Sequence, residues 1–251
     1  MNPKITRSFI SLVLSAAMLS AGQAMADDRD PLEPINRVVF SFNNGVDRVL
    51  VRPSARLYRW VMPNFAEQGV RNVFANLGEV RNASNNLLQG KWQRTAAATG
   101  RFAINSTVGV VGLFDVATRV GIEPVPEDFG QTLGYWGLGQ GPYLVLPVLG
   151  PSSLRDGTGR AVDFWQNPLL YVELEPVERG AILVVDGLQT RADLLSSDGL
   201  FSGDTYPVIR EAYFSMREFQ VNDGEVHSDA FIDDEDSEEG YVDEGFIDES
   251  F

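Results

Sequence analysis

Residues 129–154 form a run of 26 residues without a charged side chain, between Asp128 and Arg155. The run is long enough to cross a bilayer as a helix. It contains six glycines and three prolines, which argue against a simple spanning helix, because such a helix must satisfy its own backbone groups. Irregular backbone is tolerated at membrane depth where it is buried in protein or lines a cavity. The run is therefore either a buried core loop of a soluble domain or an irregular apolar segment beside a cavity.

The letters "GLGQGP" within this run match the start of a phosphate-binding G-x-G-x-x-G loop. The sixth position is Pro142 instead of glycine, and no strand–turn–helix pattern surrounds the loop. No Lys-Ser or Lys-Thr pair follows to hold a phosphate and its metal ion. These three departures exclude a nucleotide site.

The N-terminus has the pattern of a secretory signal peptide. Lys4 and Arg7 precede a 13-residue apolar run, and small residues follow at Ala24 and Ala26. The alternative is an uncleaved anchor helix, but the apolar run is shorter than the roughly 20 residues that span a bilayer. We therefore predict a signal peptide over residues 1–26, with Sec export and cleavage near Ala26.

The chain lacks the residues of common active sites. It has no cysteine, which excludes thiol catalysis and thiolate metal sites. Its only histidine, His227, lies near the C-terminus, so neither a Ser-His-Asp triad nor a histidine-ligated zinc site is expected. No G-x-S-x-G motif occurs. We expect a protein that is not an enzyme, with no catalytic residue, no metal and no cofactor.

The negative charge is concentrated at one end. Residues 222–251 hold 13 acidic residues and no Lys or Arg, whereas residues 27–221 hold 22 acidic and 18 basic residues, a net charge of −4. Without a basic stripe, nucleic acid is not an expected partner. The acidic tail over 222–251 is predicted to be disordered, as a solvating brush or as a docking segment for a partner.

Helical periodicity dominates the body of the chain. Residues 67–90 carry an apolar stripe that ends at Gly90, and residues 205–220 carry another, with Asp204 or Thr205 as the capping residue. Strand-like alternation is scarce. These patterns predict an all-α domain over residues 27–221.

Five blocks of the body, in order, resemble the MlaA (VacJ) proteins of the Gram-negative outer membrane. The blocks are "DPLEPINRVVFSFN", "NLGEVRNASNNLLQG", "RFAINSTVGVVGLFDVA", "FGQTLGYWGLGQGPYLVLPVLGPSSLRDGTG" and "REAYFSMREFQVNDG". The resemblance implies a single helical, ring-like, membrane-embedded domain with a short hairpin loop. It also implies an amphipathic channel that takes misplaced phospholipids from the outer leaflet and passes them to a soluble periplasmic lipid carrier, with a porin trimer as a further partner.

The resemblance also assigns residues to the channel and to the membrane rim. The gating hairpin corresponds to residues 137–147, with glycines as hinges and apolar side chains as the hairpin itself: Gly137, Gly139, Gly141, Tyr143, Leu144, Val145, Leu146 and Pro147. The helix at the membrane rim corresponds to "NRVVFSFN", including Phe40, Phe42 and Asn43.

Members of this family commonly carry a lipid on an N-terminal cysteine, and this chain has no cysteine. We therefore expect a location at the periplasmic face of the outer membrane, in its inner leaflet, without a lipidated cysteine. Two other functions stay open: a lipid hydrolase that works through Asp or Glu, and a structural tether of outer-membrane components that acts through the tail.

Overall fold

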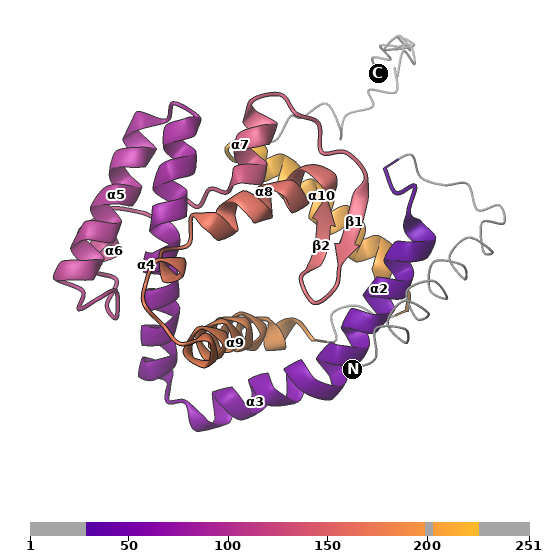
Figure 1. Ribbon diagram of the computed structural model, residues 1–251, viewed down its shortest axis with the longest axis horizontal. Coiled ribbons are helices and arrows are strands. Elements are labelled where there is room, and N and C mark those ends of the chain that lie inside the picture. The colour runs from indigo at the N-terminus through magenta and orange to yellow at the C-terminus, as the bar shows by residue number, and fades with distance from the viewer. Residues whose placement is uncertain (1–28, 199–202, 226–251) are drawn as a thin grey trace, which may run out of the picture.

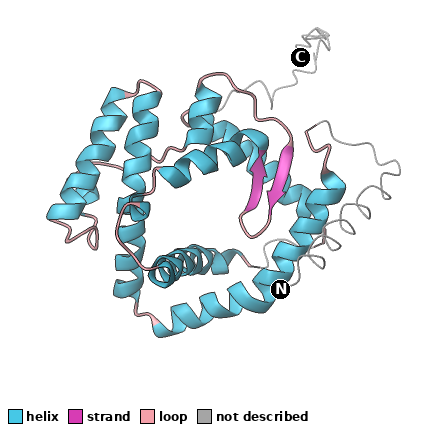
Figure 2. Cartoon of the chain, viewed as in Figure 1, coloured by secondary structure: helices cyan, strands magenta, loops and turns pink. Residues whose placement is uncertain are grey.

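The structure is a computed structural model that describes residues 29–198 and 203–225. The predicted signal peptide, His227 and most of the predicted acidic tail lie outside these residues. The prediction of an all-α fold is confirmed, with one small β-hairpin added (Figure 2). The longer helices are α2 (Glu33–Val46), α3 (Arg52–Val61), α4 (Asn64–Leu88), α5 (Trp92–Thr107), α8 (Leu154–Trp165), α9 (Pro176–Asp193) and α10 (Thr205–Val221). The shorter elements are the π-helical turn η1 (Asp47–Val51), α6 (Val116–Arg119), α7 (Phe129–Tyr135), β1 (Tyr143–Leu146), β2 (Gly150–Ser153) and the 3₁₀ turns η2 (Pro168–Leu170) and η3 (Leu194–Ser197).

Helix starts follow the local sequence. Asp128, Ser153 and Asp204 each accept a hydrogen bond from a backbone N–H in the first turn of α7, α8 and α10 respectively. Such caps satisfy backbone donors that have no partner inside the helix. Asp204 is thus the capping residue of α10. At the other end of α4, Gly90 has a φ of 73°, a left-handed conformation that glycine adopts at low cost and that terminates helices.

The helices follow one another around a ring (Figure 1). α4 packs beside α5, α7 packs against α8, and α3 packs against α9. Ion pairs tie α3 and α9 together through η1. The Arg191 guanidinium of α9 donates to Asp47 at 2.7 and 3.1 Å and to Asp198 at 2.7 Å, and Arg52 lies 3.1 Å from Asp47.

The buried positions of this ring are unusually polar. Among the described residues, 8 apolar side chains are buried against 18 polar or charged ones. The helix α4 shows the pattern clearly, because its buried positions are Gly69, Asn76, Glu79, Asn82, Asn85 and Asn86. Its predicted apolar stripe ends in Leu87 and Leu88, which are exposed. Soluble domains show the opposite arrangement.

Many large apolar side chains are instead exposed. Trp60 is 83% exposed, Phe65 80% and Trp92 70%. A second uncharged run covers residues 102–114. It ends in a turn where Val110 and Val111 adopt positive φ angles of 55° and 57° and are exposed. No helix in the described part of the chain is both long enough and apolar enough to cross a bilayer.

Candidate functional site

The long uncharged run forms a β-hairpin in its second half. β1 and β2 pair antiparallel, with Tyr143 opposite Ser153 and Leu146 opposite Gly150. The apolar segment assigned to the hairpin from the resemblance supplies only the first strand and the start of the turn. Val148 and Leu149, at the tip, are exposed, and Val148 has a φ of 68°. The hairpin therefore presents an apolar tip on a strained turn.

One face of β1 is buried in the small aromatic core. Tyr143 and Val145 are buried there, and the ring of Tyr143 lies 6.1 Å from that of Tyr206 and 5.6 Å from that of Phe214. Burial and the nearby charge of Asp30 raise the pKa of the Tyr143 hydroxyl to about 12. Leu144 and Leu146 lie on the opposite face and are half-buried. The inner residues anchor the strand, while the outer ones stay partly exposed.

The helix α2 holds β1 through two asparagines on one of its faces. The Asn36 amide donates to the Tyr143 carbonyl at 2.9 Å and accepts from the Val145 N–H at 2.9 Å. The Asn43 amide does the same one step along, with the Leu146 carbonyl at 2.9 Å and the Val148 N–H at 2.8 Å. Each side chain thus replaces a neighbouring strand for this edge of the hairpin. Asn36 begins the segment assigned to the membrane rim but was not singled out there, although its spacing of seven residues from Asn43 places both on one helical face.

The other predicted residues of α2 divide between two environments. Phe40 is partly buried and packs edge-on against Tyr206, with ring centroids 5.4 Å apart. Phe42 is exposed. The helix therefore fixes the hairpin with one polar and aromatic face and leaves Phe42 exposed.

Two of the three predicted hinge glycines need glycine for their backbone conformation. Gly137 has a φ of 89° and Gly141 a φ of 70°, both in the left-handed region. Gly139 has no such angle, and a Cβ atom added to it would meet open space. The geometric requirement for glycine thus falls on Gly137 and Gly141, at the two ends of the loop that enters β1.

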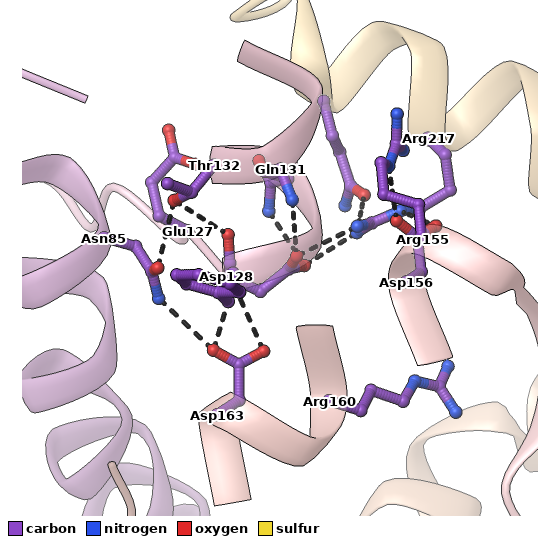
Figure 3. Close-up of polar contacts among 12 residues, drawn as sticks. Asn85, Glu127, Asp128, Gln131, Thr132, Arg155, Asp156, Arg160, Asp163 and Arg217 are labelled. Atoms are coloured by element: carbon purple, nitrogen blue, oxygen red, sulfur yellow. Dashed lines mark hydrogen bonds and ion pairs between the residues drawn. The ribbon is translucent and has the colours of Figure 1, made fainter. Parts of the chain in front are cut away.

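The base of the hairpin rests on a polar network between α7, α8 and α10 (Figure 3). The Arg217 guanidinium donates to both oxygens of Asp128, at 2.7 and 2.9 Å, and to Asp156 at 2.8 Å. Burial disfavours the charge of Asp128, but the bonds from Arg217 outweigh burial and hold the pKa of Asp128 well below its usual range. Arg160 lies apart from this network and donates to the Leu149 and Pro151 carbonyls of the hairpin, at 3.2 and 3.0 Å.

A cavity of about 370 Å³ lies away from the hairpin, between α4, α9 and the segment that joins α8 to η2. Its walls combine apolar side chains such as Phe74 and Leu183 with charged ones such as Arg81 and Asp186. Among the described residues, no group of three or more Asp, Glu, His or Cys side chains could hold a metal ion.

The sequence and this architecture match a known family. The family model described as "MlaA lipoprotein" matches residues 28–220. The chain belongs to the MlaA family. The Escherichia coli K12 member, named intermembrane phospholipid transport system lipoprotein MlaA, is 36% identical over 232 residues, covering 90% of this chain and 92% of that protein. The Haemophilus influenzae protein of the same name is 29% identical, covering 88% of this chain and 93% of that one.

A solved structure has a similar fold to this MlaA family member. It is described as the structural basis for maintenance of bacterial outer membrane lipid asymmetry, with 39% sequence identity and a TM-score of 0.67. The likeness covers 77% of this chain and 99% of that one. At 39% identity, the similar structure supports both the fold of this chain and its place in the family.

These names correct one prediction. We expected a member located at the outer membrane without a lipidated cysteine, and this prediction is wrong for the family, because its members are named lipoproteins. The printed sequence contains no cysteine. The expectation rested on the missing cysteine alone, whereas the names of the family and of its members describe lipoproteins.

Proposed function

We propose that this chain transports phospholipids and maintains lipid asymmetry in the outer membrane, without being an enzyme. It removes mislocalised phospholipids from the outer leaflet through an amphipathic path inside the ring. The named relatives belong to an intermembrane phospholipid transport system, and the similar structure concerns outer-membrane lipid asymmetry. Membership of the family supports the same substrate for this chain.

The inverted burial pattern is the single observation that carries the proposal. Buried positions that are mostly polar, with Trp60, Phe65 and Trp92 exposed, suit an apolar surrounding, and the path proposed inside the ring offers polar partners. A phospholipid has the same two requirements, because its headgroup needs polar partners and its acyl chains need apolar walls. A ring in one leaflet meets both without a helix that spans the bilayer.

The hairpin is the proposed gate of this path. Gly137 and Gly141 serve as its hinges, with Gly139 as a flexible link between them. Leu144, Leu146 and Pro147 form the proposed apolar wall of the gate, and Tyr143 and Val145 anchor it. Phe42 belongs to the proposed membrane rim, while Phe40 and Asn43 join that rim to the hairpin. The hydrogen bonds of Asn36 and Asn43 to β1 support a hairpin held from one edge.

The proposal also includes two protein partners and three segments of the chain. A soluble periplasmic lipid carrier receives the lipid, and a porin trimer holds the ring. Residues 27–221 are the transport domain, residues 1–26 are a signal peptide, and residues 222–251 are an appendage.

Deletion of the gene in its own bacterium tests the function. We expect more phospholipid on the cell surface, measured by its digestion with phospholipase added from outside, and greater sensitivity to detergent. The gene supplied in trans restores both. An intact barrier with no surface phospholipid in the deletion strain would falsify the proposal.

Truncation after Gly224 separates transport from a tether that acts through the tail. Transport predicts that the truncated chain restores most of the barrier, since the ring and hairpin remain whole. A truncated chain that is present at normal level and restores nothing favours the tether.

A further inference from the structure

The cavity between α4 and α9 contains two opposite charges that have no partner. Arg81 comes from α4 and Asp186 from α9, and both line the cavity. In the two described stretches, neither side chain makes a hydrogen bond or an ion pair within 4.0 Å. The Nε atom of Arg81 is fully buried without an acceptor. Because nearly every other charge turned inward here is paired, these two groups require a separate explanation.

Arg81 and Asp186 interact electrostatically although they form no ion pair within 4.0 Å. Burial raises the pKa of Asp186 above its usual value, and the positive charge of Arg81 partly opposes that rise. The same charge of Arg81 also opposes a rise in the pKa of Asp163, whose carboxylate is already hydrogen-bonded. An unpaired charge removed from water costs free energy unless a partner arrives. A ligand that carries a negative group for Arg81 and a positive group for Asp186 would satisfy both at once.

The other charged groups of the cavity are already occupied. Arg71 donates to Asp193 at 2.5 Å and to Glu67 at 3.3 Å. Asp163 accepts from the Phe129 N–H at 3.0 Å and from Asn85 at 3.3 Å, as Figure 3 shows in part. Arg81 and Asp186 are therefore the groups that remain available to a ligand.

The walls and the volume suit part of a lipid. Phe74, Leu77, Leu169 and Leu183 supply apolar surface beside the two charges. The volume of about 370 Å³ falls within the range of about 300–1,000 Å³ that is common for small-molecule sites. A phospholipid headgroup with its glycerol and the first part of its acyl chains combines charged and apolar groups in the same way.

We infer that this cavity binds the phosphoethanolamine headgroup of phosphatidylethanolamine, with Arg81 on the phosphate and Asp186 on the ammonium. The inference rests on the proposed function and names the lipid that it favours. The guanidinium donates hydrogen bonds to phosphate oxygens, and the primary ammonium donates hydrogen bonds to the carboxylate. Phosphatidylglycerol lacks the ammonium, so it leaves Asp186 unpaired beside a phosphate of the same sign.

Binding of short-chain lipids to the full chain in mild detergent tests the inference. By titration calorimetry we expect dihexanoyl phosphatidylethanolamine to bind about tenfold more tightly than dihexanoyl phosphatidylglycerol, the ratio that about 1.4 kcal/mol from one charge-assisted bond produces. Asp186→Asn removes this preference, and Arg81→Gln weakens the binding of both lipids. Glu123→Gln and Arg119→Gln, which change exposed charges outside the cavity, leave the preference unchanged.

Three results would overturn the inference. Equal binding of the two lipids by the unaltered chain is one, and a preference that survives Asp186→Asn is another. The third is glycerophosphoethanolamine, the soluble headgroup without acyl chains, binding as tightly as the lipid, which assigns the cavity to a soluble compound. A merely structural role for Asp186 predicts a loss of stability in Asp186→Asn, whereas an unpaired carboxylate predicts none.

Failure of the inference is distinguishable from failure of the proposed function. A chain that moves both lipids at the same rate, before and after Asp186→Asn, contradicts the headgroup site alone. A chain that moves no phospholipid of either kind contradicts the proposed function.

Discussion

Arg217 joins three helices through one guanidinium. It reaches from α10 to Asp128 at the start of α7 and to Asp156 in the first turn of α8. Tyr213 donates to the same Asp156 carboxylate. Removing the cation leaves the Asp128 carboxylate without an arginine partner, whereas Asp156 keeps Arg155, which donates to it at 2.9 Å. The hairpin lies in the segment that joins α7 to α8. The residue thus fixes the base on which the hairpin stands.

We expect Arg217→Met to lower the free energy of unfolding by about 3–5 kcal/mol, the cost of leaving a buried charge without its partner. Urea denaturation in mild detergent measures the loss. The matched control, Arg119→Met, changes an exposed arginine outside the network and stays within about 0.5 kcal/mol of the unaltered chain. Equal stability of the two variants contradicts a structural role for the network.

Asp128 gives this network a pH dependence of known sign. Its pKa is lower in the folded chain than in the unfolded chain, so the stability it contributes is present above the unfolded value of about 3.9 and lost as the pH falls through the folded value. Asp115, whose pKa falls to about 2, adds to the same trend. We expect Asp128→Asn to be less stable than the unaltered chain at pH 7, with the difference shrinking below pH 4. A difference that is constant with pH from 7 to 3 contradicts the assignment.

At the scale of elements, the hairpin is held by side chains more than by a sheet. α2 supplies Asn36 and Asn43 on one edge, and α8 supplies Arg160 on the other. The two asparagines hold different parts of β1. Asn36 is buried and fixes the inner part of β1, whereas the bonds of Asn43 lie near the exposed tip. The tip is therefore the part that can open first.

Substituting each asparagine in turn distinguishes the contact of Asn36 from that of Asn43. We expect Asn36→Leu to cost about 1–3 kcal/mol, because it leaves the buried Val145 N–H and Tyr143 carbonyl without partners. Asn43→Ala costs less and increases hydrogen exchange at the Val148 amide, while the Val145 amide stays protected. Amide exchange by mass spectrometry reads both. Equal protection at Val148 in the variant and the unaltered chain contradicts the hold on the tip.

The hinge glycines can be tested by substituting Gly141, with Gly139 as the control. Gly141→Ala places a Cβ in the left-handed region, at a cost of about 1–2 kcal/mol. Gly139→Ala meets no atom within 4 Å and has no left-handed φ, so its stability changes by about 0.5 kcal/mol at most. Gly141→Pro cannot adopt the φ of 70° and is expected to change lipid transfer while the helices stay folded. If circular dichroism shows a folded Gly141→Pro chain that transfers lipid normally, the hinge is not there.

Periodicity predicts the helices well but predicts their orientation poorly. The stripe over residues 67–90 and the caps at Gly90 and Asp204 follow from local chemistry, and α4 and α10 form as predicted. A period of 3.6 residues shows that a helix has two faces, but it does not show which face meets lipid and which meets protein. The half of the hairpin in β2 was missed because glycine, proline and two serines carry no strand pattern.

The whole molecule explains why the residues of the cavity were missed. Arg81 and Asp186 are far apart in the sequence, and each alone is typical of an exposed position on an amphipathic helix. Only the packing of α4 beside α9 brings them to one cavity. The family resemblance, by contrast, led correctly to the fold class, because five ordered blocks constrain the path of the chain.

Among the described residues, buried positions are mostly polar and many large apolar side chains are exposed, which is the inverse of a soluble domain. Membrane-facing helices can be apolar outside without loss, because lipid tails replace the water that a soluble protein would meet. The buried asparagines of α4 instead hold this helix to its neighbours: Asn76 donates to the Ser106 hydroxyl of α5 at 2.9 Å, and Asn85 accepts from the Thr132 hydroxyl of α7 at 3.0 Å. This arrangement supports the proposed movement of phospholipid.

Transfer of intact phospholipid by the purified full chain tests that account most directly. The chain is reconstituted into vesicles that contain radiolabelled phospholipid, and the soluble lipid carrier of the same bacterium is added as acceptor. We predict intact labelled phospholipid on the carrier, at a rate well above that of protein-free vesicles and lower for Gly141→Pro than for Gly139→Ala. Transfer no faster than from protein-free vesicles, or label recovered as lysophospholipid or fatty acid, would contradict it.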